Sequence, residues 1–282
     1  MSIRPDRGGS PKPGTLSRVA VVGVAYSARR LPRESVSGGV WNAMEDYVRC
    51  LQEGTTLRVS RLPLIDCTEP AVVDRICSIG TDVGVVLLVG MSPPRCEALV
   101  RRVAERGGPI VVTETDLTTI ALAASVLSAL AHQGVAGHGG RVVISHPERA
   151  PLLGPVLIQC GVSSVTSWSR HDAQDFSLRR VIANNDVLVD LSSDFVGGEA
   201  ERTVGIGSIA DASLALPGLF ESLSRHAALR FDVPTIASCA QALVLLTPTE
   251  KLLPGSCETL LTTAVARYAD KALDRHTTSI TG

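Results

Sequence analysis

Short runs of β-branched residues alternate with helical segments along most of this chain, and that alternation most constrains how it can fold. Apolar runs at 18–25, 57–65, 83–91 and 109–113 are each followed by a stretch with the pattern of a helix. Such a succession favours a largely parallel sheet with helices on its faces. The run at 83–91 is apolar throughout, which indicates a strand covered on both sides. We therefore predict an α/β fold.

A second and shorter alternation follows a glycine-rich turn at 134–140. After it, strands are predicted at 141–145, 164–168 and 186–192, with a helix at 152–161. Three helices complete the prediction, at 217–229, 234–246 and 257–273.

These patterns predict two α/β domains, with the C-terminal helices packing back on the core. Residues 1–17 are polar and rich in Gly and Pro, so we expect a flexible arm there. The first domain is predicted to span 18–133 and the second 134–282. The helix at 115–132 is apolar on nearly every face, so we expect it to lie buried between the two domains.

Composition excludes several classes of partner. The formal net charge is −1, so no global basic field exists to hold nucleic acid or an anionic membrane. The apolar stretches at 83–91 and 120–131 are too short to span a bilayer. Seven cysteines occur without a C-x-x-C pair, which is typical of a reducing compartment and of a chain without a zinc site or disulfide framework. We expect a soluble, cytoplasmic protein.

Three stretches of the sequence contain recognisable motifs, and the order of the motifs along the chain is informative. Residues 44–54 read MEDYVRCLQEG, residues 92–130 read SPPRCEALVRRVAERGGPIVVTETDLTTIALAASVLSAL, and residues 214–223 read LALPGLFESL. They resemble malic enzymes, which read M-E-G-K-A-L-L-F-K-E-F, then S-A-P-R-C-F-E-I-E with P-V-F-H-D-D-Q-H-G-T-A, then L-A-F-P-G-I-F-R-G-A-L. The resemblance implies a Rossmann-like second domain, here degenerate, and a homodimer.

The resemblance also implies a lysine that this chain lacks. Malic enzymes use a lysine and a tyrosine to move protons, and the second lysine of K-A-L-L-F-K matches Gln52. A neutral amide cannot exchange a proton near neutral pH. No lysine lies between residues 13 and 250, so no substitute is near in sequence.

The metal ligands of the family are mostly missing as well. Its adjacent Glu–Asp pair matches Val89 and Gly90, and its D-D pair matches Thr113 and Glu114. Mg²⁺ and Mn²⁺ prefer several oxygen ligands, usually with more than one carboxylate. Because at most one carboxylate survives, we expect no metal site.

The phosphate-binding turn of the family is replaced. Its G-x-G-x-x-G/A motif matches residues 145–151, which read SHPERAP. The two prolines remove amide donors. Glu148 places a negative charge where phosphates would lie at a helix N-terminus. We therefore expect no nicotinamide cofactor in the family's mode.

Three charged side chains remain as candidate site residues. Glu114 and Asp116 lie at a strand-to-helix junction, where they could act as acid and base on a small molecule in the interdomain cleft. The alternative is that Thr115 or Asp116 caps the helix, whose first turn favours acids. Arg95, kept from the P-R-C motif, either contacts a ligand or forms a structural ion pair.

Other polar residues have a functional and a structural interpretation too. His146 and Glu148 could form an acid–base pair or be ordinary loop polarity. Cys96 and Cys239 lack a neighbouring base in sequence, which favours small buried residues. The segment 192–194, Ser-Ser-Asp, could line the cleft or be a plain turn.

Two functions are compatible with the loss of the lysine, the metal ligands and the phosphate-binding turn. The first is a non-catalytic malic-enzyme-like protein that acts as a binding or regulatory partner. The second is a cofactor-independent cyclase, isomerase or lyase of a specialised biosynthetic pathway, with Glu114 and Asp116 as acid and base. A cleft with convergent carboxylates would favour the enzyme, and a cleft filled by side chains would favour the partner.

Overall fold

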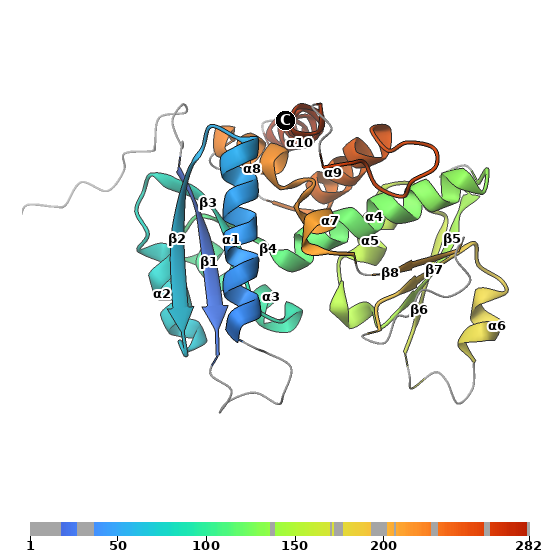
Figure 1. Cartoon of the computed structure of the whole chain (residues 1–282), viewed down its shortest axis with the longest axis horizontal. Helices are drawn as coiled ribbons and strands as arrows, with labels where there is room; N and C mark the ends of the chain where they lie inside the picture. Colours follow the sequence, from blue (N-terminus) through green and yellow to red (C-terminus); the bar gives the residue numbers. More distant parts are fainter. Residues whose placement is uncertain are drawn as a thin grey trace, which may run out of the picture.

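The chain forms two four-stranded sheets surrounded by helices, which is the predicted α/β fold (Figure 1). This computed structural model describes residues 18–26, 37–135, 139–169, 171, 177–192, 202–205, 207–226, 231–256 and 260–280. The arm at 1–17 lies outside the described residues, so its flexibility stays a prediction.

The first sheet is parallel throughout and has the strand order β2-β1-β3-β4. Its strands lie within two residues of the predicted runs: β1 (Arg18–Ala25), β2 (Arg58–Ile65), β3 (Val83–Val89) and β4 (Ile110–Thr113). The connecting helices are α1 (Ser37–Gly54), α2 (Glu69–Cys77) and α3 (Pro93–Glu105).

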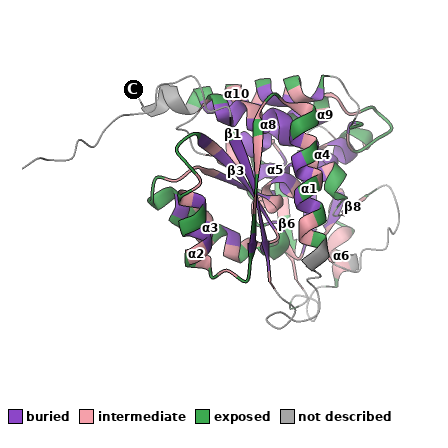
Figure 2. Ribbon diagram, turned by 60° about the vertical axis from the view of Figure 1, so that its left-hand side comes forward, coloured by how far each residue is buried: buried purple, intermediate pink, exposed green. Residues whose placement is uncertain are grey.

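The central strands of this sheet are covered on both faces. Val19 and Val21 of β1 pack with α1, whereas Ala20 and Val22 pack with α2 and α3. Side chains alternate between the two faces of a strand, so a run without polar residues must be covered on both. Figure 2 shows β1 and β3 buried between their helices.

The second sheet repeats the topology of the first. It is also parallel, with the strand order β6-β5-β7-β8. Its strands are β5 (Arg141–Ser145), β6 (Ser164–Trp168), β7 (Val187–Asp190) and β8 (Thr203–Gly205). A 3₁₀ turn (Pro147–Arg149) and the helices α5 (Leu153–Gln159) and α6 (Leu178–Ile182) lie between the strands. The predictions contain neither β8 nor α6, because elements this short carry little periodicity.

Helix α4 (Glu114–His132) joins the two halves of the molecule, as its all-round apolar surface predicted. It contacts β3 and β4 of the first sheet, β7 and β8 of the second, and α5. One hydrophobic cluster runs from α1 through α4 into the second sheet. By length and composition α4 could cross a membrane, but most of it is buried inside this fold, as in the core helix of a soluble protein.

Four C-terminal helices complete the core: α7 (Ile209–Ser213), α8 (Leu216–Arg225), α9 (Val233–Leu245) and α10 (Leu261–Ile280). Helix α8 contacts β1 and β3, α9 contacts α4 and α5, and α10 packs on both α8 and α9. Gly218 permits the close approach of α8 to α10, because a Cβ there would lie 2.4 Å from the carbonyl oxygen of Thr262. Gly218 is therefore needed for the close packing of α8 against α10.

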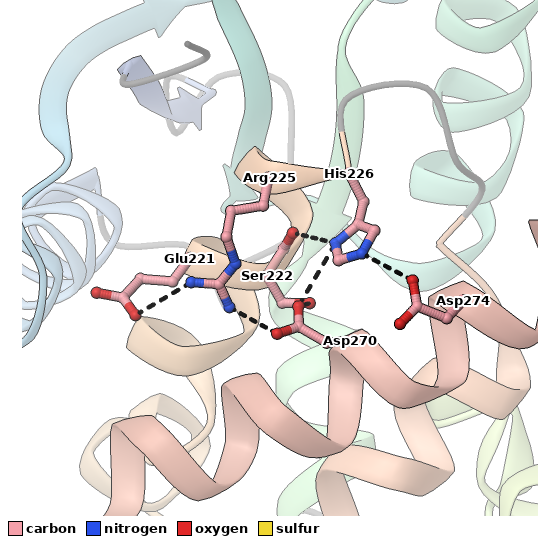
Figure 3. A network of polar contacts seen from close by, with 6 residues as sticks. All are labelled: Glu221, Ser222, Arg225, His226, Asp270 and Asp274. Atoms are coloured by element: carbon pink, nitrogen blue, oxygen red, sulfur yellow. Dashed lines mark hydrogen bonds and ion pairs between the residues drawn. The ribbon is translucent and has the colours of Figure 1, made fainter. Parts of the chain in front are cut away.

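Polar side chains also hold α8 against α10 (Figure 3). Asp270 accepts a hydrogen bond of 2.6 Å from the Ser222 hydroxyl and one of 2.8 Å from Arg225. The imidazole of His226 lies between Asp270 and Asp274, with N···O distances of 3.4 and 3.3 Å. All these contacts are between helices, so we interpret the network as structural.

Candidate functional site

The shared strand order gives each sheet one place where successive connections leave in opposite directions. In the first sheet this place lies between β1 and β3, and in the second between β5 and β7. Open parallel sheets bind ligands in the crevice at the carboxyl ends of such strands. The two carboxyl edges are therefore the candidate sites.

At the first edge, Glu114 joins three elements. It opens α4 directly after β4, and its carboxylate accepts a 2.7 Å hydrogen bond from the amide of Gly90, after β3. The hydroxyl of Tyr47, on α1, is hydrogen-bonded to the same carboxylate. Burial raises the pKa of Glu114, and the two hydrogen bonds only partly oppose that effect. Glu114 is thus a half-buried acid beside a buried phenol.

The carboxylate of Asp116 is part of the N-terminal cap of α4. It accepts hydrogen bonds of 2.8 Å from both the amide and the hydroxyl of Thr113, and the amide of Asp116 donates to that hydroxyl. This is a capping box, in which the N-cap residue and the third helical residue satisfy each other's amides. The expected cap, Thr115 or Asp116, was therefore placed too late. Thr113 is the cap because it is the last residue of β4 and has an extended conformation, and the helix begins at the next residue.

Arg95 forms the ion pair that its structural interpretation predicts. Its guanidinium donates to Glu69 at 2.9 Å and to the Tyr26 hydroxyl at 2.6 Å, and it lies 4.4 Å above the Tyr26 ring centre. Tyr26 follows β1, while Glu69 and Arg95 lie in the first turns of α2 and α3. The three side chains tie the ends of β1, α2 and α3 together.

The first edge does not fit a divalent cation. Gly90 has a φ of +87°, and a Cβ there would lie 2.6 Å from the carbonyl oxygen of Val24. An acidic ligand at that position would therefore strain the backbone. The four positions that match the family's metal ligands are Val89, Gly90, Thr113 and Glu114, so Glu114 is their single carboxylate. Val89 is also fully buried. Within the described residues no three His, Cys, Asp or Glu side chains are grouped as metal ligands.

The residue of α1 that reaches this edge is Tyr47 rather than Gln52. Gln52 is exposed, whereas Tyr47 is 1% exposed and faces Glu114. Burial raises the pKa of Tyr47, with the nearby carboxylate adding to the effect. Among the described residues the only lysines, Lys251 and Lys271, are exposed on the loop after α9 and on α10.

At the second edge, Ser145 and Asp190 lie side by side. They are paired in register at the ends of β5 and β7, and the serine hydroxyl donates to the aspartate at 2.6 Å. Asp190 also accepts from the amide of Ser192 at 3.0 Å and from its hydroxyl at 3.1 Å. Burial alone would raise the pKa of Asp190, but these hydrogen bonds outweigh it and lower the pKa. The second edge therefore carries an ionised carboxylate near neutral pH.

The turn after β5 contains His146 in a left-handed conformation, with a φ of 53°. Its Nδ1 lies 3.4 Å from the Ser145 hydroxyl, and its ring is nearly perpendicular to that of Trp168, with the ring centroids 6.5 Å apart. Glu148 is exposed, and the described residues show no contact between it and His146. Arg149 donates to the carbonyl of Leu191 at 2.9 Å. The turn is thus fixed by contacts to β6 and β7.

The cysteine interpretation is confirmed where the structure describes it. Cys96 is 5% exposed and Cys239 is fully buried. Burial raises the pKa of each thiol to about 12, so neither is a nucleophile near neutral pH. Of the segment 192–194, only Ser192 lies within the described residues.

A small cavity lies where α4 passes α7. It measures about 40 Å³, and Thr118, Ser125 and Ser208 are among its lining residues. That is room for a few water molecules at most. A small-molecule ligand in the interdomain cleft stays a prediction.

Comparison with solved structures gives the same fold. A malic enzyme from Pyrococcus horikoshii superposes with a TM-score of 0.73 over 93% of this chain and 78% of that one, at 14% identity. The NAD-dependent malic enzyme from Thermotoga maritima gives 0.73 over 91% and 84%, and that of Entamoeba histolytica 0.71 over 93% and 71%, each at 14% identity.

The chain has the fold of malic enzymes. The resemblance seen in its motifs is confirmed for the fold, and the second domain is the Rossmann-like half. At identities this low the likeness shows the fold alone. No family model matches the sequence, and no curated protein does.

Several residues of the two edges are absent from the candidate site residues of the sequence analysis, among them Tyr26, Tyr47 and Asp190. Tyr47 lies within an amphipathic helix and looks like an ordinary core aromatic until the helix is placed beside Glu114. Asp190 ends a β-branched strand and is followed two residues later by a serine. That pattern is a usable signal for a carboxylate at a strand end.

Proposed function

We propose that this chain is a non-catalytic binding or regulatory protein of malic-enzyme fold, which does not perform NAD(P)- and metal-dependent oxidative decarboxylation. The observation that carries the proposal is the carboxylate of Asp190 at the crevice between β5 and β7. A dinucleotide would bring its pyrophosphate to such a crevice. An ionised carboxylate repels that group, and Pro147 and Pro151 offer no amides to offset the repulsion.

The first edge supports the same conclusion. Oxidative decarboxylation needs a cation to polarise the substrate oxygen, and the backbone at Gly90 leaves no room for an acidic ligand. Asp116 and Arg95 already have partners that stabilise the fold. The side chains that would contact a substrate are therefore already hydrogen-bonded to other residues of the protein.

Ligand binding by thermal shift, together with an absorbance assay, tests this function. We expect NADH, NADPH, Mn²⁺ and malate to leave the melting temperature unchanged, and malate with Mn²⁺ to give no reduction of NAD⁺. A ligand at a hundred times its Kd would stabilise the native state by about 2.7 kcal/mol, which is readily detected. The Thermotoga maritima enzyme is the positive control. Saturable stabilisation by either dinucleotide, or steady NAD⁺ reduction, would contradict the proposal.

A cofactor-independent enzyme is the second candidate, and Glu114 favours it. Its raised pKa and its contact with Tyr47 are properties of a general acid. Asp116 is the weaker candidate of the two, since its carboxylate holds the capping box. Such an enzyme would exchange protons of a bound keto acid with solvent. Deuterium incorporation into pyruvate or oxaloacetate that is lost in Glu114→Gln, and kept in Glu105→Gln on α3, would support it. Exchange equal to that without protein would argue against it.

We also propose a cytoplasmic homodimer, as the resemblance and the cysteine usage imply. Sedimentation equilibrium of the purified chain tests the assembly. A mass near twice 29.6 kDa is expected, and a mass near 29.6 kDa would contradict the dimer.

A further inference from the structure

The cavity beside α4 is lined by polar side chains from two helices that are far apart in the sequence. Thr118 and Ser125 line it from α4, whereas Ser208 and Asp211 line it from the N-terminal end of α7. The other lining residues are apolar or glycine. Figure 1 shows α7 lying against α4, and the two helices are in contact. Four polar side chains therefore converge on one cavity of about 40 Å³.

Two hydroxyls of this cavity are left open to a guest molecule. Within the described residues, the hydroxyls of Thr118 and Ser125 form no hydrogen bond, although Ser125 is only 7% exposed. Thr119, by contrast, donates to the carbonyl of Thr115 at 2.7 Å. A buried hydroxyl without a partner destabilises a fold, so it is normally satisfied by water or by a ligand.

Asp211 supplies the only charge among the described residues that line the cavity. Its Oδ2 accepts hydrogen bonds of 2.7 Å from the Ser208 amide and 2.8 Å from the Ser208 hydroxyl. Its Oδ1 accepts none from the described residues, so this oxygen is left for a ligand. A carboxylate in a wall without Lys or Arg attracts a positively charged group and repels an anion.

We propose that this cavity binds the primary ammonium group of a small amine. Such a group has three N–H donors, and three acceptors line the cavity: Oδ1 of Asp211 and the hydroxyl oxygens of Thr118 and Ser125. An ammonium group is about as large as a water molecule, so it fits the available volume. The cavity is partly open to solvent, so the alkyl part of the amine extends outward. This inference rests on the proposed function, because it gives a non-catalytic binding protein the chemical class of its ligand.

Thermal shift at constant ionic strength tests the site with methylammonium chloride. So small a ligand has a limited affinity, and we expect a Kd of about 10 mM. At about ten times that Kd, the Tm should rise by about 3 °C. Tetramethylammonium chloride is the control, because it has the same charge but is larger and has no N–H donor. No saturable rise with methylammonium, or an equal rise with tetramethylammonium, overturns the proposal.

Variants locate the binding. Ser125→Ala removes a hydroxyl that has no partner among the described residues, so it should fold and should weaken methylammonium binding about threefold. Ser128→Ala is the matched control on the same helix. The Ser128 hydroxyl is buried and also lacks a partner, but Ser128 does not line the cavity, so binding should be unchanged.

Asp211→Asn removes the charge, keeps an oxygen that can accept from Ser208, and should weaken binding at least about tenfold. If this variant does not fold, as judged by circular dichroism, Ser125→Ala decides. Wild-type affinity in Ser125→Ala, or equal losses in the two serine variants, overturns the proposal.

NADH and NADPH in the same assay separate the two failures. If neither the dinucleotides nor methylammonium raise the Tm, the ammonium site is wrong while the proposed function stands. If a dinucleotide raises it, the proposed function is wrong, and the methylammonium titration still decides the site.

Discussion

The two sheets share one strand order, yet their carboxyl edges differ in charge. At the first edge Arg95 is paired with Glu69, and Glu114 is a half-buried acid with a raised pKa. At the second edge Asp190 is held as an ion by hydrogen bonds from Ser145 and Ser192. The topology fixes where a crevice lies, and the residues at the strand ends decide what it attracts.

Central and outer strands differ in how far they are covered. The central strands of the first sheet have helices on both faces, and β3 is almost entirely buried. The central strands β5 and β7 of the second sheet are also largely buried, whereas its outer strand β6 has no buried residue. Substitutions should therefore be more costly in the central strand β3 than in the outer strand β6.

The largest difference is expected at two helix glycines. Gly218→Ala puts a Cβ 2.4 Å from the Thr262 carbonyl oxygen, so α8 and α10 must separate, at a cost of about 2–3 kcal/mol in unfolding free energy. Gly154→Ala in α5 meets its nearest atom, on Val165, at 3.7 Å and should stabilise the protein by about 0.5 kcal/mol. Urea denaturation measures both. Equal effects would mean that the two glycines are packed alike.

A valine in the central strand β3 and one in the outer strand β6 should give the next largest difference. Val85→Ala in the buried strand β3 removes two methyl groups from a closed core and should cost about 2 kcal/mol. Val165→Ala in β6 should cost about half as much, because that side chain is only partly buried. Denaturation midpoints of the two variants decide the comparison, and a larger loss for Val165→Ala would reverse it.

The two carboxylates should give opposite pH dependences of stability. Folded Glu114 holds its proton more tightly than the unfolded chain does, so its contribution falls as pH rises above its ordinary pKa of 4.5. Asp190 has a lowered pKa, so its contribution is present above its ordinary 3.8 and is lost as pH falls below it. The difference in unfolding free energy between the wild type and Glu114→Gln should shrink with rising pH. For Asp190→Asn it should grow, and slopes of the same sign would contradict the assignment.

The smallest effect is expected at two arginines. Arg95→Lys loses the planar group that contacts both Glu69 and Tyr26, and should cost up to about 1 kcal/mol because the pair is partly exposed. Arg149→Lys loses one hydrogen bond to a backbone carbonyl and should cost less. Thermal melts of the two variants rank the two losses of stability. A larger loss for Arg149→Lys would show that the arginine of the second edge contributes more to stability.

Much of the fold could be predicted from patterns along the chain. Strands β1, β3 and β5 and helices α3 and α4 were all indicated, because apolar runs and helix periodicity are local properties. The cap of α4 was misplaced, since Thr113, Thr115 and Asp116 are all capping residue types and only the end of β4 selects among them. The short elements β8, α6 and α7 carried too few residues to show a period.

The sequence by itself determined the α/β class, the resemblance to malic enzymes, and the absence of lysine from residues 13 to 250. Only the tertiary structure decided which side chains meet. Tyr47 and Glu114 are far apart in the chain, as are Ser145 and Asp190. The physical reason is that propensity and periodicity act over a few residues. The pairing of strand ends and the burial that shifts a pKa depend instead on how separate elements pack.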